Sequence, residues 1–258
     1  MKIVTWNVNS VRTRIDHLIY LIKKYSPDIV CLQETKVVDD SFPEKKFLEL
    51  GYFSYFCGIP SYNGVAILSK IKAQKIHSYN FCKKKDARHL QINLGPYQIH
   101  SIYVPAGGDL PDPKLNDKFK YKLSFLDEMD KWSAKLKKKN ILCGDLNIAP
   151  LKDDVWSHKS LENVVSHTKI EREKLIEIIK NGKWMDCVRE FINPPENVYT
   201  WWSYRSPDFT KNNRGRRLDH IWISDSMARD LKEVQILKSF RELKKPSDHV
   251  PIIIDLKI

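Results

Sequence analysis

The sequence predicts an α/β fold in which a mixed sheet is covered by helices on the outside. Short apolar runs of strand length recur along the whole chain, and most are bounded by Gly, Pro, Asn or Asp. Helical patterns separate the early and middle runs, whereas the stretch 65–104 resembles hairpins, so parallel and antiparallel neighbours are both expected. The expected strands are Ile3–Val8, Ile29–Leu32, Val65–Leu68, Leu90–Leu94, Ile99–Val104, Ile141–Cys143, Leu218–Ile223 and Ile252–Leu256.

Three segments have the apolar spacing of a helix. From Val11 to Tyr25 the apolar side chains recur on one face, and Pro27 ends the pattern. A second such face covers Phe119 to Leu136, and a weaker one covers about Glu171 to Lys180. Sites are usually built on surface loops beside strand ends. The two loop-like stretches are Gly107–Asp117 and Asn193–Gly215.

The length and composition indicate one compact domain over residues 1–258. A chain of 258 residues is near the upper limit for a single hydrophobic core. The content of 42% hydrophobic and 11% aromatic residues excludes disorder and low complexity. Neither a repeat nor a Gly/Ser-rich linker divides the sequence.

The net charge of +12 favours a polyanionic partner, with nucleic acid ahead of an anionic membrane surface. The alternative is a lysine-rich protein whose charge is simply solvated. No apolar run approaches the roughly 18 residues that a spanning helix needs, and the first residues lack the pattern of a signal peptide. We therefore expect a cytoplasmic protein that does not bind membranes.

The cysteines indicate reduced core thiols and not zinc ligands. They are odd in number and form no Cys-x-x-Cys pair. Two of them lie within apolar strand-like runs. The five are Cys31, Cys57, Cys82, Cys143 and Cys187.

The most informative segment runs from Ile141 to Asn147, where an apolar strand stops at a carboxylate and an amide. On an extended backbone, residues two apart point to the same side, so Asp145 and Asn147 can reach one bound species. A carboxylate beside an amide suits a water or a phosphate. Taken alone, this segment is explained better by an Asx turn that closes a strand than by catalysis.

Other strand ends carry polar side chains in the same way. Asp219 lies between apolar residues, and a buried carboxylate needs a partner, for which His249 is the candidate. Such a pair is either a catalytic unit or a satisfied structural contact. With Glu34, Asp145 and Asp248 there are enough oxygen ligands for one hard divalent cation, Mg²⁺ or Mn²⁺, but not for a structural zinc site. The remaining strand-end residues are Asn7, Asn9, Gln33, Tyr103 and Ser247.

Several motifs together resemble the exonuclease III family of abasic-site endonucleases, and they occur in the family's order. The resemblance covers essentially the whole chain and is closer to the bacterial enzymes than to the longer eukaryotic ones. It departs from the family at Asp186–Arg189, at Trp222, and at Asn9, where some relatives carry Asp. The motifs are Trp6–Asn9, Pro27–Lys36, Gly64–Ser69, Tyr103–Pro105, Gly144–Asn147, Tyr199–Arg205, Asn213–Asp219 and Ser247–His249.

The resemblance implies a four-layered α/β sandwich, two mixed sheets face to face with helices outside. It implies a Mg²⁺-dependent enzyme of base-excision repair, with Mn²⁺ as the other metal expected. This enzyme hydrolyses the phosphodiester 5′ to an abasic site and has 3′-5′ exonuclease and 3′-end repair activities. The expected substrate is double-stranded DNA with abasic or blocked 3′ sites, and a monomer is expected.

The resemblance also assigns roles. Glu34 is the main metal ligand, with Asn7 and Asp248 beside it. Asp145 activates the attacking water. Asn147 holds that water or stabilises the phosphate, and Tyr103 contacts the phosphate or the leaving oxygen. His249, with Asp219 behind it, binds the phosphate. It stays open whether there are one or two metals, and whether Asp145, Asn147 or His249 is a further ligand.

A loop that mixes aromatic and cationic side chains is expected to contact DNA, because aromatic rings stack on unpaired positions and cations hold phosphates. Alternatively its tryptophans are core and its arginines solvated. The family suggests a tight apolar pocket that excludes a base. Two rival functions remain, a phosphodiesterase for lipid or inositol phosphates and a non-catalytic DNA-binding protein. The loop residues are Trp201, Trp202, Tyr204, Arg205, Lys211, Asn213, Arg214, Arg216 and Arg217.

Overall fold

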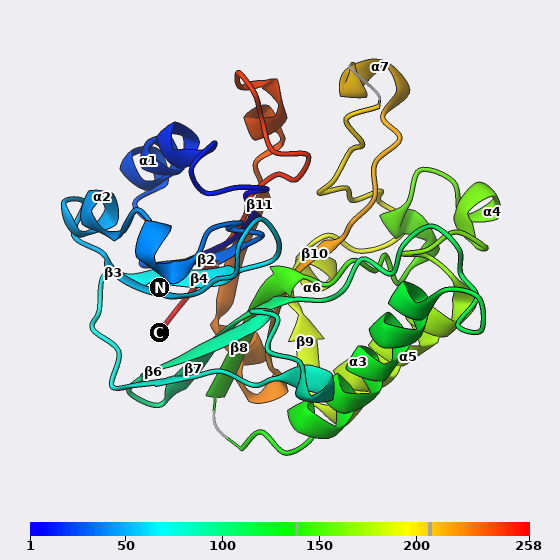
Figure 1. The fold of residues 1–258 in the computed structure, drawn as a ribbon, viewed down its shortest axis with the longest axis horizontal. Helices are drawn as coiled ribbons and strands as arrows, with labels where there is room; N and C mark the ends of the chain where they lie inside the picture. The colour runs from blue at the N-terminus through cyan, green and yellow to red at the C-terminus, as the bar shows by residue number, and fades with distance from the viewer. Residues whose placement is uncertain (138, 206–207) are drawn as a thin grey trace.

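The structure, a computed structural model, describes residues 1–137, 139–205 and 208–258, and within these ranges two sheets of six strands pack face to face (Figure 1). The first sheet has the order β11-β12-β1-β2-β4-β3, with β1 Lys2–Asn7, β2 Ile29–Gln33, β3 Phe53–Cys57, β4 Val65–Ser69, β11 Leu231–Ile236 and β12 Ile252–Leu256. The second has the order β5-β6-β7-β8-β10-β9, with β5 Lys75–His77, β6 His89–Leu94, β7 Tyr97–Tyr103, β8 Lys139–Asp145, β9 Trp184–Asp186 and β10 Asp219–Ser224. Each sheet contains one parallel pair, β1 with β2 and β7 with β8.

Helices cover the outer face of each sheet. Figure 1 shows α1 and α2 beside the first sheet and α3 and α5 beside the second. These layers confirm the expected four-layered α/β sandwich. The helices are α1 Ile15–Tyr25, α2 Glu44–Leu48, α3 Asp117–Ser133, α4 His158–Leu161, α5 Lys169–Asn181, α6 Cys187–Phe191 and α7 Phe209–Asn212.

The core between the sheets explains why the strands have continuous apolar runs. Ile3 and Cys31 of the first sheet and Cys143 and Ile221 of the second belong to one buried cluster. The alternate residues of the same strands face the helices, as Val4 does with α1. Because both faces of each sheet are buried, alternation with polar residues is lost.

All eight expected strands are present, but the stretch 65–104 does not form one sheet. Strand β4 pairs in the first sheet, whereas β5, β6 and β7 belong to the second, so the chain crosses between the layers here. Four strands were not predicted. Three of them, β3, β5 and β9, are edge strands, and β5 is exposed throughout, which leaves little apolar signal in the sequence. The fourth, β11, is the other edge of the first sheet.

The helices begin and end where local chemistry requires. Ser26 ends α1 in the left-handed region (φ 47°), and its N–H donates to the Ile22 carbonyl at 2.9 Å. Thr168 and Glu171 form a capping box at the start of α5. The first predicted helix is four residues too long, because the chain forms turns from Val11 and the helix begins at Ile15.

The cysteine prediction is only partly right. Cys31, Cys143 and Cys187 are buried free thiols, as expected of core residues. Cys57 and Cys82 are free but only half-buried, because one lies on an edge strand and the other in a surface turn. Within the described ranges, no helix has the length and apolar character needed to cross a membrane. The single domain over 1–258 stays a prediction.

Candidate active site

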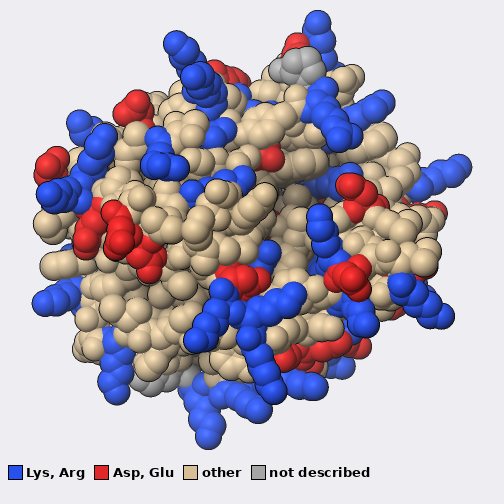
Figure 2. Space-filling view, viewed as in Figure 1, with Lys and Arg blue, Asp and Glu red and all other residues tan. Residues whose placement is uncertain are grey.

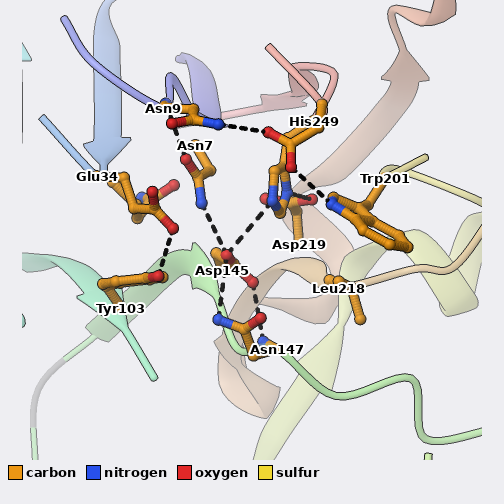
Figure 3. A network of polar contacts seen from close by, with 12 residues as sticks. Asn7, Asn9, Glu34, Tyr103, Asp145, Asn147, Trp201, Leu218, Asp219 and His249 are labelled. Carbon is orange, nitrogen blue, oxygen red and sulfur yellow. Dashed lines mark hydrogen bonds and ion pairs between the residues drawn. The ribbon is translucent and has the colours of Figure 1, made fainter. Parts of the chain in front are cut away.

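Strand register brings the candidate residues to one edge of the sandwich (Figure 3). In the second sheet Asp145 pairs with Tyr103 on one side and with Asp219 on the other. In the first sheet Asn7 ends β1, and Glu34 directly follows β2. The two sheets meet where the Asn7 Nδ2 donates to Asp145 Oδ2 at 2.8 Å. Residues 138 positions apart are thereby in direct contact.

Asp145 is the buried centre of this cluster, with 1% of its surface exposed. The backbone N–H of Asn147 donates to Asp145 Oδ1 at 2.9 Å, and the Asn147 Nδ2 donates to Oδ2 at 3.3 Å. Asn147 adopts φ 53°, which turns the chain back so that both groups reach the carboxylate. Burial and the nearby charge of Asp219 raise the pKa of Asp145 to about 7, against the opposing effects of His249 and Asn7. A carboxylate with this pKa can accept a proton near neutral pH.

His249 is held between two carboxylates. Its Nδ1 donates to Asp219 Oδ2 at 2.8 Å, and its Nε2 lies 3.7 Å from Asp145 Oδ2. Although burial disfavours the charged ring, Asp219 and Asp145 raise the pKa of His249 to about 10. The site therefore contains an imidazolium at neutral pH. The expected pairing of Asp219 with His249 is present, and it lies at the site.

Glu34 faces the cluster from the first sheet in a left-handed conformation (φ 51°). The Tyr103 hydroxyl donates a short hydrogen bond to Glu34 Oε1, and Lys36 Nζ lies 2.8 Å from Oε2. Although burial opposes ionisation, Lys36 and the Tyr103 hydrogen bond hold the pKa of Glu34 below its usual value. Lys36 Nζ also donates to Asn9 Oδ1 at 2.6 Å.

Asp248 is held by two neutral donors. Asn9 Nδ2 donates to its Oδ1 at 3.0 Å, and Trp201 Nε1 donates to its Oδ2 at 2.9 Å. Although burial opposes ionisation, the charge of His249 and these two hydrogen bonds lower the pKa of Asp248. The structure thus gives Asn9 a role that sequence reasoning missed, because its partner is 239 positions away.

The cluster offers a candidate metal site. Ligand atoms of Asp145, Asp219 and His249 lie within 4.8 Å of one another. Asp219 Oδ1 is buried and has no hydrogen-bond partner within the described residues, so it retains a free lone pair for a ligand. The carboxylates of Asp145 and Asp219, with that of Glu34 opposite, fit a hard divalent cation, whereas His249 would join them only after losing a proton. Glu34 itself lies outside this close group of ligand atoms.

A cavity of about 800 Å³ opens beside the cluster. Figure 2 shows Lys and Arg side chains around the hollow on this face. Sequence reasoning missed several of its lining residues, because these lie in irregular segments without a polar motif. Those residues are Ala106, Trp156, Val164, Val165 and Ser166, whereas Gly108 and Asp109 lie in the expected loop Gly107–Asp117.

The aromatic and cationic loop divides into exposed and buried members. Trp201 is half-buried and lines the cavity. Trp202 is only 1% exposed and donates to Asn213 Oδ1 at 3.1 Å, so the prediction that its ring stacks on DNA is wrong. Arg217 is also fully buried and is neither solvated nor at the surface. It lies 2.7 Å from both Asp154 and Asp186. The exposed members are Tyr204, Arg205, Lys211, Asn213 and Arg214.

A two-sheet sandwich with a buried carboxylate, an imidazolium and amides at one edge defines a phosphodiesterase-type enzyme. Known proteins agree with this class. The family model described as Endonuclease/Exonuclease/phosphatase family matches residues 4–249, and the chain belongs to this family. Within it the chain is of the exonuclease III type.

Three relatives cover the whole chain or nearly so. An exodeoxyribonuclease from Bacillus subtilis is 30% identical over 269 residues, which cover all of both chains. The solved structure of an AP endonuclease from Archaeoglobus fulgidus is 31% identical, has a TM-score of 0.93 and covers all of both chains. That of a 3′ phosphatase from Neisseria bound to product DNA hairpin is 30% identical, with a TM-score of 0.92 and 99% of both chains covered.

Proposed function

We propose that this protein is a DNA-repair nuclease that hydrolyses the phosphodiester 5′ to an abasic site in double-stranded DNA. We further propose 3′-5′ exonuclease and 3′-end repair activities. The observation that carries the proposal is the buried Asp145, bonded to Asn7 of the other sheet and 3.7 Å from the His249 imidazolium. The names of the relatives, an exodeoxyribonuclease, an AP endonuclease and a 3′ phosphatase, support the substrate.

The chain's own residues supply the proton transfer and much of the charge. Asp145, with its pKa near 7, accepts a proton as the water oxygen bonds to phosphorus. The bond from phosphorus to the 3′ oxygen of the preceding nucleotide breaks, and that oxygen takes up a proton from solvent. His249 Nε2 donates a hydrogen bond to a phosphate oxygen as negative charge develops there. Asn147 and Tyr103 would do the same by turning a donor away from Asp145 and Glu34, to which they donate in this structure. The products are a 3′-hydroxyl and a 5′-deoxyribose phosphate.

A divalent cation completes the proposed site, Mg²⁺ first and Mn²⁺ as the alternative. Glu34 would be its principal ligand, with Asn7 and Asp248 in the same shell. Asp145 and Asn147 would offer a second position, which His249 would join as a ligand only in its neutral form. When bound, the cation neutralises charge on the phosphate. Metal titration under equilibrium dialysis distinguishes one site from two.

The DNA would lie across the face that carries the cavity. Trp201 would pack against the abasic position, and the exposed loop residues Tyr204, Arg205, Asn213 and Arg214 would contact the backbone. The net charge of +12 supports a polyanionic substrate. We propose that the protein acts as a monomer in the cytoplasm.

The proposal is tested on a duplex with one abasic site, labelled at each end in separate reactions. We expect nicking that EDTA abolishes and Mg²⁺ restores, with a 3′-hydroxyl on the upstream fragment. A duplex with an ordinary nucleotide at the same position is the control and stays uncut internally. Hydrolysis of a sphingolipid or inositol phosphate without incision of the abasic duplex would assign the protein to the lipid branch of the fold instead.

A further inference from the structure

Arg216 is a largely buried cation without an anionic partner among the residues that the structure describes. Its Nη1 donates to the Val165 carbonyl at 3.1 Å and to Ser166 Oγ at 2.7 Å. Its Nε is buried and has no hydrogen-bond partner in the described part of the chain. No carboxylate of the described residues lies within 4.0 Å of the guanidinium. The adjacent Arg217, by contrast, is paired with two carboxylates.

Backbone pairing directs Arg216 toward the cavity. Arg216 forms an antiparallel bridge with Trp201, and Trp201 forms one with His249. Residues directly opposite each other on antiparallel segments place their side chains on the same face. Arg216, Trp201 and His249 therefore form one row, and all three line the cavity. The guanidinium carbon lies 5.4 Å from the centre of the Trp201 ring.

The other charges around the cavity make the position of Arg216 unusual. The groups that line the cavity include the carboxylates of Glu34, Asp145 and Asp248. Burial lowers the pKa of Arg216, and only the more distant Glu171 opposes this effect. Glu171 already has a partner, because Lys122 Nζ lies 2.6 Å from its Oε1. Among the described residues, two neutral acceptors and the Trp201 ring offset only part of the desolvation of the guanidinium, and a bound anion would offset more.

We infer that Arg216 forms an anion subsite next to the reacting phosphate and selects substrates whose group in the cavity is negatively charged. The inference rests on the proposed function. In that function one oxygen of the phosphate is the leaving 3′ oxygen, and the cavity holds the other group that is esterified to the phosphate. A planar guanidinium binds a carboxylate or a phosphate through paired hydrogen bonds. A blocked 3′ end that terminates in such a group fits this subsite better than a neutral one.

The lining of the cavity differs from the tight apolar pocket that the family suggests, because it includes charged side chains. Trp201 and Leu218 do line the cavity, as that expectation requires. Arg216 lies two residues before Leu218 and is a cation in the same wall. A neutral abasic sugar gains nothing from this charge, whereas an oxidised sugar fragment with a carboxylate does.

The test uses duplexes with a gap whose 3′ phosphate carries one of three esters. Glycolate ends in a carboxylate, ethylene glycol is its neutral counterpart, and ethylene glycol phosphate ends in a phosphate. We expect kcat/KM for an anionic end to exceed that for the neutral end by about 10-fold or more, as for a charge-assisted hydrogen bond. Whichever anionic end is preferred identifies the ligand as carboxylate or phosphate.

Variants show whether Arg216 causes the preference for an anionic end. Arg216→Gln should bring the ratio of anionic to neutral kcat/KM close to one, and Arg216→Lys should keep part of it. Arg205→Gln is the matched control, because Arg205 lines the same cavity but is exposed, so it should weaken all three substrates alike. Circular dichroism checks that each variant folds. An equal ratio in the wild type and Arg216→Gln, or no preference in the wild type, overturns the inference.

A binding measurement separates this inference from the proposed function. In EDTA, fluorescence anisotropy gives the dissociation constant of each end without turnover. We expect the wild type to bind an anionic end about 10-fold or more tightly than the neutral end, and Arg216→Gln to bind both alike. If the wild type cleaves none of the ends in Mg²⁺, the proposed function fails, but the binding measurement in EDTA still tests whether Arg216 binds the anionic group. Equal affinities for all ends in the wild type would refute the anion subsite.

Discussion

The buried ion pair of Lys122 and Glu171 gives a sharp test of how the active site is supported. Both side chains are 0% exposed, and Lys122 Nζ lies 2.6 Å from Glu171 Oε1. The same ammonium donates to the carbonyl of Asn147 at 2.8 Å and to that of Ala106 at 3.2 Å. It therefore joins α3 and α5 to Asn147, which lies two residues after the end of β8 at Asp145.

Lys122→Met removes the cation but leaves the buried carboxylate of Glu171. Loss of one partner from a buried pair costs about 3–5 kcal/mol. For a chain of this size, that lowers the melting temperature by roughly 6–20 °C. The double variant Lys122→Met/Glu171→Gln should recover part of this loss, because the amide oxygen can still accept from the backbone N–H groups of Ser166 and Thr168.

Urea unfolding followed by tryptophan fluorescence measures these free energies of unfolding. Incision kinetics on the abasic duplex measure how far the loss of the hydrogen bond to Asn147 changes catalysis. We expect kcat to fall with little change in KM, because the Asn147 carbonyl loses its anchor while the DNA-binding surface is untouched. Lys120→Met on the same helix is the control, since that lysine is exposed, and should change stability by less than about 0.5 kcal/mol. A loss below about 1 kcal/mol in Lys122→Met, or a double variant less stable than the single one, would refute this reasoning.

Three further predictions concern catalysis, pH and packing. Asp145→Asn and His249→Ala should each lower incision by about 10²–10⁴-fold while DNA affinity in a binding assay changes little, and retained incision in both would remove their assigned roles. Burial lowers the pKa of His100 to about 4, so the unfolded chain binds more protons below about pH 6.5. This histidine alone should therefore lower the free energy of unfolding by about 2 kcal/mol between pH 7.5 and pH 5, and His100→Gln should remove that contribution in urea titrations; an unchanged slope would contradict the burial argument. In Gly144→Ala the new Cβ would lie 2.1 Å from the Ile102 carbonyl oxygen, so β7 and β8 must separate. A thermal melt should show that the free energy of unfolding falls by about 1–3 kcal/mol. An unchanged melting temperature would mean that the two strands separate at no cost.

Local sequence pattern predicted much of the fold because strand and helix periodicities are short-range signals. The runs that are buried on both faces, such as Ile29–Leu32 and Ile141–Cys143, were recognisable from their continuous apolar character. Edge strands such as β5 lack that character, since their side chains are exposed. The division of the strands between two sheets was likewise invisible in the residues themselves, because strand pairing depends on contacts far apart in the chain.

The sequence by itself determined the chemistry that the site can perform. It placed carboxylates, amides and a histidine at strand ends, in an order that resembles one family, and it carried the positive charge that suits a polyanion. Side-chain alternation fixed which of these residues share a side of their own strand, as with Asp145 and Asn147.

Only the tertiary structure decided what those residues touch and how they ionise. Asn7 meets Asp145 across the two sheets, and burial beside Asp219 and His249 moves the pKa of Asp145 to about 7. Between α6 and β10, burial makes Trp202 a core residue, while Arg217 gains two carboxylate partners and Arg216 gains none among the described residues. Adjacent residues of the same type thus acquire different roles. The reason is physical: desolvation and Coulomb interactions depend on distances in space, which the order of residues along the chain does not specify.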